Sequence, residues 1–212
     1  FLPSVMKKNM LIPKSEELFY QAKRFVVMMQ LFKLFILTSI RKKEGEKMKS
    51  ENILNGKKIL IVDDEPDVLE TLIELLNMCK IDTAPSFESG KQLMENHGYD
   101  LAILDIMGVK GFELLEIANL QKIPALMLTA NALSEESLKK SAENGAAYYL
   151  PKDKMIDIEI YVTDVFTALQ KKKSTWEKLF DRLGGFYDER FNGTGWREKE
   201  KSFWEKKMRT KF

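Results

Sequence analysis

Five short segments of strand length recur along the middle of this chain, four of them apolar, at residues 58–62, 101–105, 123–128 and 147–150, and one mixed, at residues 81–84. A continuous apolar run is typical of a strand buried on both faces of a parallel sheet. The stretches between them place apolar residues three and four apart, which predicts amphipathic helices. Such alternation of strands and helices predicts an α/β fold, a doubly wound five-stranded parallel sheet with helices on both faces.

Proline, serine and glycine mark where the helices should begin and end. Pro66 suits the first turn of a helix, and Ser86 suits the position that caps one. Gly145 is typical of a residue that follows a helix. The expected helices cover approximately residues 66–76, 86–97, 112–118, 133–144 and 156–169.

Polar side chains lie at or after the carboxyl ends of four of the five expected strands. Asp63 and Asp64 come after the first, Asp105 ends the third, Thr129 follows the fourth, and Lys152 comes soon after the fifth. Because ligands of parallel sheets bind beyond the carboxyl ends of the strands, we expect these side chains to converge at one edge. The alternative is that the acids are ordinary helix caps and loop residues.

Three converging carboxylates repel one another, and a bound Mg²⁺ ion would relieve that repulsion with oxygen ligands. Asp105 is ionised without help and can attack phosphorus directly. Lys152 and Thr129 would then contact the transferred group, since phosphoryl transfer depends mainly on positioning and charge stabilisation. The pattern therefore predicts phosphoryl transfer to Asp105.

Four motifs occur in order: Lys-Ile-Leu-Ile-Val-Asp-Asp-Glu from Lys58, Leu-Asp at Asp105, Met-Leu-Thr-Ala around Thr129, and Tyr-Leu-Pro-Lys from Tyr149. Over residues 57–170 this set resembles the receiver domain of bacterial two-component response regulators, a flavodoxin-like fold. The resemblance implies that Asp105 is the phosphoacceptor, with Thr129 and Lys152 as catalytic partners and Thr129 with Tyr149 as the switch. The implied magnesium ligands are Asp63, Asp64, Asp105 and the backbone carbonyl of Met107.

The resemblance also implies a function. We expect a cytoplasmic signalling protein that receives a phosphoryl group from a histidine kinase or a histidine phosphotransfer protein and signals through protein–protein contacts with a target that the sequence does not identify. It would catalyse only its own magnesium-dependent phosphorylation and dephosphorylation. Two alternatives are a nucleic-acid-binding regulator that acts through a basic aromatic tail, and a metal-dependent phosphatase or other doubly wound enzyme. No nucleotide-binding loop supports the last of these.

Two departures from the family pattern lie next to the expected site. The family usually has Met-Pro after the acceptor and a glycine eight positions on, whereas here the proline is missing and Gly111 comes six positions after Asp105. The family's Lys-Pro is replaced by Lys152-Asp153, with proline moved to Pro151. We therefore expect a shorter loop beside the acceptor.

Charge divides the chain into three parts, which we take as domains. Residues 51–171 form the expected receiver, between a basic N-terminal extension, 1–50, and a basic, aromatic and helical extension, 172–212. Basic residues outnumber acidic ones by 11 to 4 in residues 1–50 and by 13 to 7 in residues 171–212. Between them, acidic residues outnumber basic ones by 21 to 10. The single cysteine, Cys79, excludes an internal disulfide and suits a reducing cytoplasm.

The N-terminal extension has two interpretations. Met48 is a candidate start, in which case the residues before it are not native. Alternatively, Phe25 to Ile40 is a functional helix, since 12 of its 16 residues are apolar. It is short for a membrane span, and Lys33 at its centre would cost about 2.5 to 3.5 kcal/mol on insertion scales. This favours an interfacial or partner-bound helix over a spanning one.

The C-terminal extension holds all three tryptophans of the chain. Its pattern predicts one helix that begins after Ser174 and is stopped by Gly184 and Gly185, and a second over residues 196–208. Aromatic residues mixed with lysine and arginine suit docking on a partner or on nucleic acid. Equally, they suit packing back onto the receiver or onto another copy of the chain.

Overall fold

The structure is a computed structural model that describes residues 52–130 and 134–210. The extension expected at residues 1–50, including the apolar segment 25–40 and Met48, lies outside the described residues. Among the residues that are described, no helix is long and apolar enough to cross a membrane.

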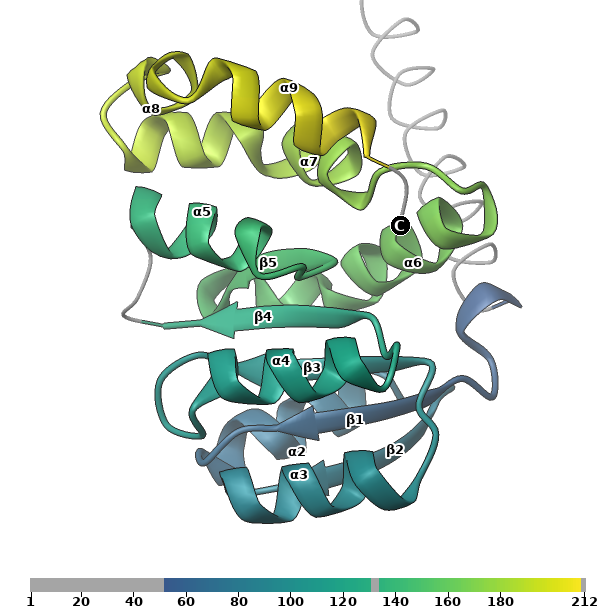
Figure 1. Cartoon of the computed structure of the whole chain (residues 1–212). Helices are drawn as coiled ribbons and strands as arrows, with labels where there is room; N and C mark the ends of the chain where they lie inside the picture. Colours follow the sequence, from purple (N-terminus) through teal and green to yellow (C-terminus); the bar gives the residue numbers. More distant parts are fainter. Residues whose placement is uncertain (1–51, 131–133, 211–212) are drawn as a thin grey trace, which may run out of the picture. The chain divides into compact units, whose positions relative to one another are not determined.

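Five parallel strands form one sheet, in the order β2-β1-β3-β4-β5 (Figure 1). The apolar runs explain why: β3 is buried along its whole length, and β4 and β5 are buried as completely. The predicted doubly wound sheet is confirmed. The strands are β1 (Lys58–Val62), β2 (Lys80–Ala84), β3 (Leu101–Asp105), β4 (Ala125–Thr129) and β5 (Tyr148–Pro151).

Helices cover both faces of the sheet, with α3 and α4 packed together on one face and α2 and α6 together on the other. Pro66 begins α2, Ser86 caps α3, and Ser134 caps α5. The helices are α2 (Pro66–Leu75), α3 (Phe87–Asn96), α4 (Gly111–Leu120), α5 (Glu135–Glu143), the 3-10 helix η1 (Lys152–Asp157), α6 (Ile158–Gln170), α7 (Thr175–Arg190), α8 (Gly195–Lys199) and α9 (Lys201–Arg209).

The strands are in register at their carboxyl ends. Val62 pairs with Leu104, so the residues that follow β1 lie beside the end of β3. Asp105 pairs with Leu128, and Thr129 pairs with Pro151. One edge of the sheet therefore collects the last residues of four neighbouring strands.

The expected stop at Gly184 and Gly185 is wrong, because α7 continues through both glycines to Arg190. A Cβ atom on Gly184 would lie 3.0 Å from Nη2 of Arg197, whose guanidinium donates a 2.8 Å hydrogen bond to the Gly184 carbonyl. Glycine is thus present so that Arg197 can approach the helix. The second expected helix is also divided, into α8 and α9, at Glu200.

Helices α7 to α9, residues 175–209, are called the helical cap below. Their aromatic rings pack on one another: Trp204 contacts Trp176, Phe180 and Trp196 at centroid distances of 5.8, 5.2 and 5.6 Å. All three tryptophans are at most 3% exposed. Packing back onto the receiver is therefore the interpretation that the structure supports, since buried rings offer no surface for stacking on bases.

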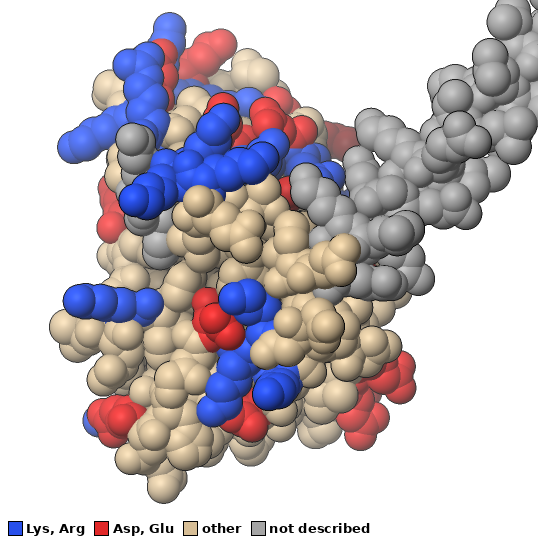
Figure 2. All heavy atoms as spheres, turned by 90° about the vertical axis from the view of Figure 1, so that its right-hand side faces the viewer, with Lys and Arg blue, Asp and Glu red and all other residues tan. Residues whose placement is uncertain are grey.

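Several basic side chains of the cap lie on its exposed outer side. Figure 2 shows Lys and Arg gathered at the top of the view, the level at which Figure 1 draws the cap. Lys201, Lys206 and Arg209 of α9 are among the exposed ones. The cap thus separates its aromatic inner side from a charged outer side.

Candidate functional site

The carboxyl edge of the sheet brings together two acids and a lysine from three different strand ends. The Lys152 Nζ atom lies 2.7 Å from Oδ2 of Asp63 and 2.9 Å from Oδ1 of Asp105. Both carboxylate side chains are almost completely buried, at 1% and 4% exposed, and the lysine is 11% exposed. The structure therefore places these three predicted site residues in direct contact.

Glu65, to which the sequence interpretation gave no role, also contacts this lysine, with its Oε1 atom 2.7 Å from Nζ. We call Asp63, Glu65, Asp105 and Lys152 the acidic edge. It holds three acids and one ammonium, and so carries excess negative charge. The position of Glu65, directly before the proline that opens α2, was a signal that it faces the same edge as Asp63.

The backbone after β3 fixes the orientation of Asp105. Its Oδ2 atom accepts hydrogen bonds from the N–H groups of Met107, at 2.8 Å, and Gly108, at 2.9 Å. The chain then turns so tightly that a Cβ on Gly111 would lie 2.0 Å from the Asp105 carbonyl oxygen. Only glycine fits there, which is how this short loop leads from Asp105 directly into α4.

Burial and charge act in opposite directions on the ionisable groups of the acidic edge. Burial raises the pKa of Asp63, although hydrogen bonds from Lys152 and from the Glu65 N–H oppose that rise. Burial also disfavours the ammonium of Lys152, but hydrogen bonds to Asp63, Glu65 and Asp105 outweigh it and raise the pKa of this lysine. The lysine therefore stays charged between the buried carboxylates.

Asp64 is exposed, and its carboxylate packs against the loop after β3, where a Cβ on Gly108 would lie 1.7 Å from its Oδ1. In the ranges that the structure describes, no three His, Cys, Asp or Glu side chains are grouped so as to hold a metal ion by themselves. Magnesium needs only one or two protein carboxylates besides water and phosphoryl oxygens. The oxygen donors of Asp63, Asp64 and Asp105 fit that chemistry, and their role as ligands stays a prediction, as does that of the Met107 carbonyl.

Thr129 is the last residue of β4, Tyr149 lies within the neighbouring strand β5, and both are completely buried. The Tyr149 hydroxyl lies 2.7 Å from Oγ of Ser137, and it also hydrogen-bonds the side chain of Thr129. Burial raises the pKa of this tyrosine, while those hydrogen bonds lower it. Ser137 in turn completes the cap of α5 by exchanging hydrogen bonds with Ser134. The predicted switch pair is therefore connected to the first turn of α5.

The helical cap reaches the same tyrosine from the other side, a contact that sequence reasoning missed. Tyr187 of α7 is completely buried and donates a 3.0 Å hydrogen bond to the Tyr149 carbonyl. The two rings are 6.3 Å apart. Nothing in the spacing of the aromatic residues indicated which of them would meet β5.

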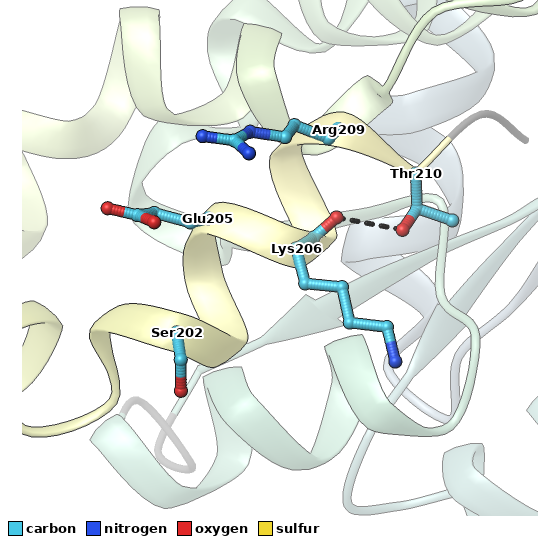
Figure 3. Close-up of a pocket in the computed structure, with 5 residues that line it drawn as sticks. All are labelled: Ser202, Glu205, Lys206, Arg209 and Thr210. Atoms are coloured by element: carbon cyan, nitrogen blue, oxygen red, sulfur yellow. Dashed lines mark hydrogen bonds between the residues drawn. The ribbon is translucent and has the colours of Figure 1, made fainter.

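Surface hollows occur on the C-terminal helices, away from the acidic edge. One of about 380 Å³ lies along α9 and is lined by Ser202, Glu205, Lys206, Arg209 and Thr210 (Figure 3). Its side chains are exposed or half-buried, and none belongs to the acidic edge. The chemistry of the molecule is therefore best sought at the carboxyl edge of the sheet.

Comparison with known proteins agrees with this geometry. Residues 59–161 match the family model of the response regulator receiver domain. Among solved structures, the chain is similar to a crystal structure of a CheY-like response regulator receiver domain protein from Methanospirillum hungatei JF-1. The identity is 27% and the TM-score 0.50, and the match covers 55% of this chain and 98% of that one.

Curated relatives are larger proteins. The chain is 39% identical over 103 residues to the two-component response regulator ARR18 of Arabidopsis thaliana, covering 46% of this chain and 16% of that protein. It is 33% identical over 140 residues to the two-component response regulator ORR21 of Oryza sativa subsp. indica, covering 63% of this chain and 20% of that protein. The chain thus spans a fifth or less of the length of these relatives.

Proposed function

Because residues 59–161 are a response regulator receiver domain, we propose that this protein accepts a phosphoryl group on Asp105 and signals through protein–protein contacts. The phosphoryl donor is a histidine kinase or a histidine phosphotransfer protein. The observation that carries the proposal is the contact of Lys152 with the buried Asp105, at 2.9 Å, at the end of the central strand β3. This contact holds a positive charge next to the carboxylate that would act as the nucleophile.

The residues of the acidic edge divide the work of the transfer. An Oδ atom of Asp105 forms the new bond to phosphorus, while the bond from phosphorus to the donor nitrogen breaks and its electron pair stays on the imidazole. Oδ2 is held by two N–H groups, so Oδ1, on the side of Lys152, is the atom that attacks. The ammonium then lies where the phosphoryl oxygens arrive and stabilises their charge.

Magnesium, when bound, would neutralise charge on the phosphoryl oxygens and on the carboxylates. Asp63 and Asp64 are the residues that would hold it, together with Asp105. Asp63 is suited to this because its buried Oδ2 atom has the ion pair with Lys152 as its only described contact. When Lys152 turns to the phosphoryl group, that oxygen needs a new cation.

The hydroxyl of Thr129 is the group that senses the phosphoryl group. It stands at the end of β4, next to the end of β3 that carries Asp105. A phosphoryl group adds about −1.5 to −2 charge and three acceptor oxygens, which attract a hydroxyl donor. Movement of Thr129 would disturb its hydrogen bond to Tyr149 and so alter the neighbouring surface.

The first test is phosphorylation with a small phosphodonor and Mg²⁺. We expect intact mass to show one added phosphoryl group that hydroxylamine removes, as it does from acyl phosphates. Asp105→Asn should abolish the addition, because an amide is no nucleophile. Asp67→Asn, an exposed acid in the first turn of α2, is the matched control and should be labelled normally. Equal labelling of the Asp105→Asn protein would disprove the assignment.

A further inference from the structure

Buried hydrogen bonds and charged contacts hold the helical cap on the face formed by α5, β5 and α6. Buried donors bind the backbone at β5: Nε1 of Trp176 donates to the Ala146 carbonyl at 2.9 Å, and the Tyr187 hydroxyl donates to the Tyr149 carbonyl at 3.0 Å. An unpaired buried donor costs free energy, so these two bonds fix where α7 lies. α7 thus sits against the last strand of the sheet.

Charged contacts bind the cap to the helices on either side of β5. Lys139 of α5 pairs with Glu200 at 2.8 Å and lies over the ring of Phe203. Arg182 of α7 pairs with Asp164 of α6, a carboxylate that is 8% exposed. The face beyond the switch residues is therefore not open to a separate target, since the chain's own C-terminal helices occupy it.

Resting hydrogen bonds connect the predicted switch to this covering. At rest Thr129 is hydrogen-bonded to the Tyr149 side chain, so a Thr129 side chain that turns its hydroxyl toward a phosphoryl oxygen moves away from this partner. Tyr149 contacts α5 through its hydroxyl and α7 through its carbonyl and ring. Closely packed elements respond to such a change by moving between discrete arrangements rather than by stretching.

On the basis of the proposed function, we infer that the helical cap is the built-in target of the receiver, and that phosphorylation of Asp105 loosens it from α5 and β5. First the hydrogen bond between Thr129 and Tyr149 is lost, and then the Tyr149 ring shifts. The contacts of Tyr187 with the Tyr149 carbonyl and ring weaken as a result. A ligand shifts such an equilibrium only by its differential affinity for the two states. The loosened cap exposes its aromatic inner side and the β5 face together.

The chain carries its own reporter for this event. All three tryptophans belong to the cap and are buried, so intrinsic tryptophan fluorescence reports on the cap alone. Hydrogen–deuterium exchange over residues 175–209 reports opening of the same helices. Both measurements use the full chain, with and without a small phosphodonor and Mg²⁺, while intact mass records phosphoryl groups on the same samples.

In the unsubstituted protein we expect the phosphodonor to speed exchange in residues 175–209 by roughly 5- to 150-fold, the usual range of coupling between sites, and to shift tryptophan emission to the red. Asp105→Asn should show neither change. Phosphorylation recorded by mass with unchanged exchange and emission would overturn the inference while leaving the proposed function intact. Absence of any phosphoryl group would overturn both.

Tyr187→Phe removes one hydroxyl from the contact and keeps the ring. Without phosphodonor it should speed exchange of residues 175–209 by roughly twofold to tenfold, the worth of one hydrogen bond. Its phosphorylation should be normal. Tyr99→Phe is the matched control, because Tyr99 is also buried and donates one hydrogen bond, to Asp82 at 2.8 Å, near the opposite edge of the sheet. Equal exchange of the cap in the two variants would contradict the role of Tyr187.

Discussion

The acidic edge and the helical cap each contain a buried cluster of side chains, but the two clusters are held together by opposite means. At the acidic edge three carboxylates depend on one ammonium, so the arrangement is complete only when more positive charge or a charged substrate arrives. In the cap the rings of Trp176, Phe180 and Trp204 satisfy one another. Excess negative charge at the acidic edge favours binding of a cation or a charged group. The complementary rings of the cap favour its packed arrangement over an open one.

The largest effect should come from removing Trp176, the cap ring that hydrogen-bonds the backbone of the receiver. Trp176→Ala should destabilise the cap by about 3 to 5 kcal/mol, since it leaves a cavity and an unpaired Ala146 carbonyl. We expect lower resistance to urea for the cap, with phosphorylation of Asp105 retained. Trp176→Phe, which keeps most of the ring, should cost less. Loss of phosphorylation in both variants would show that the two regions are not separable.

Removing the only cation of the acidic edge should have a comparable but reversible effect. Lys152→Met leaves Asp63 and Asp105 buried without compensation, which should cost about 3 kcal/mol of unfolding free energy. Because a cation can take the place of the ammonium, Mg²⁺ should restore more stability to this variant than it adds to the unsubstituted protein.

Lys171→Met, an exposed lysine after α6, provides the control and should change stability little. Urea titrations with and without Mg²⁺ measure both effects. If the Lys152→Met protein is as stable as the control, the buried carboxylates of Asp63 and Asp105 do not depend on the ammonium. The acidic edge would then not be held together by charge, and its contrast with the aromatic cap would be wrong.

The smallest effect concerns the two adjacent glycines of α7. A Cβ on Gly185 meets nothing within 4 Å, so Gly185→Ala should stabilise the helix by about 0.5 to 1 kcal/mol. Gly184→Ala gains the same propensity but crowds Arg197, so it should stabilise less or not at all. Thermal unfolding of the pair measures the difference. Equal stabilisation would show that Arg197 moves aside without cost.

The sheet and the acidic edge were predictable because they follow from local sequence. Four of the five strands are largely apolar and buried, the edge strand β2 being the exception, and Asp63, Asp105 and Thr129 each stand at the end of one of the four. Parallel pairing then brings those ends together regardless of the loops between them. Glu65 escaped notice because an acid before a helix proline has an ordinary local explanation.

The cap was not predictable to the same degree. The spacing predicted a helix after Ser174 that stops at Gly184 and Gly185 and a second helix over residues 196–208. In the structure the first continues to Arg190 and the second is divided at Glu200. The spacing of the aromatic residues is compatible with packing inward or with docking elsewhere. A ring carries no information about which backbone carbonyl it will meet.

By itself, the sequence determined a five-stranded parallel sheet and the set of residues at its carboxyl edge, because strand burial and strand ends are local properties. Only the tertiary structure decided that Lys152 bridges Asp63, Glu65 and Asp105, and that Tyr187 meets Tyr149. Those contacts join residues far apart in the chain, and their geometry depends on how whole helices pack. The hydrophobic effect has no direction, so the shape of the assembled fold decides which residues a buried ring contacts.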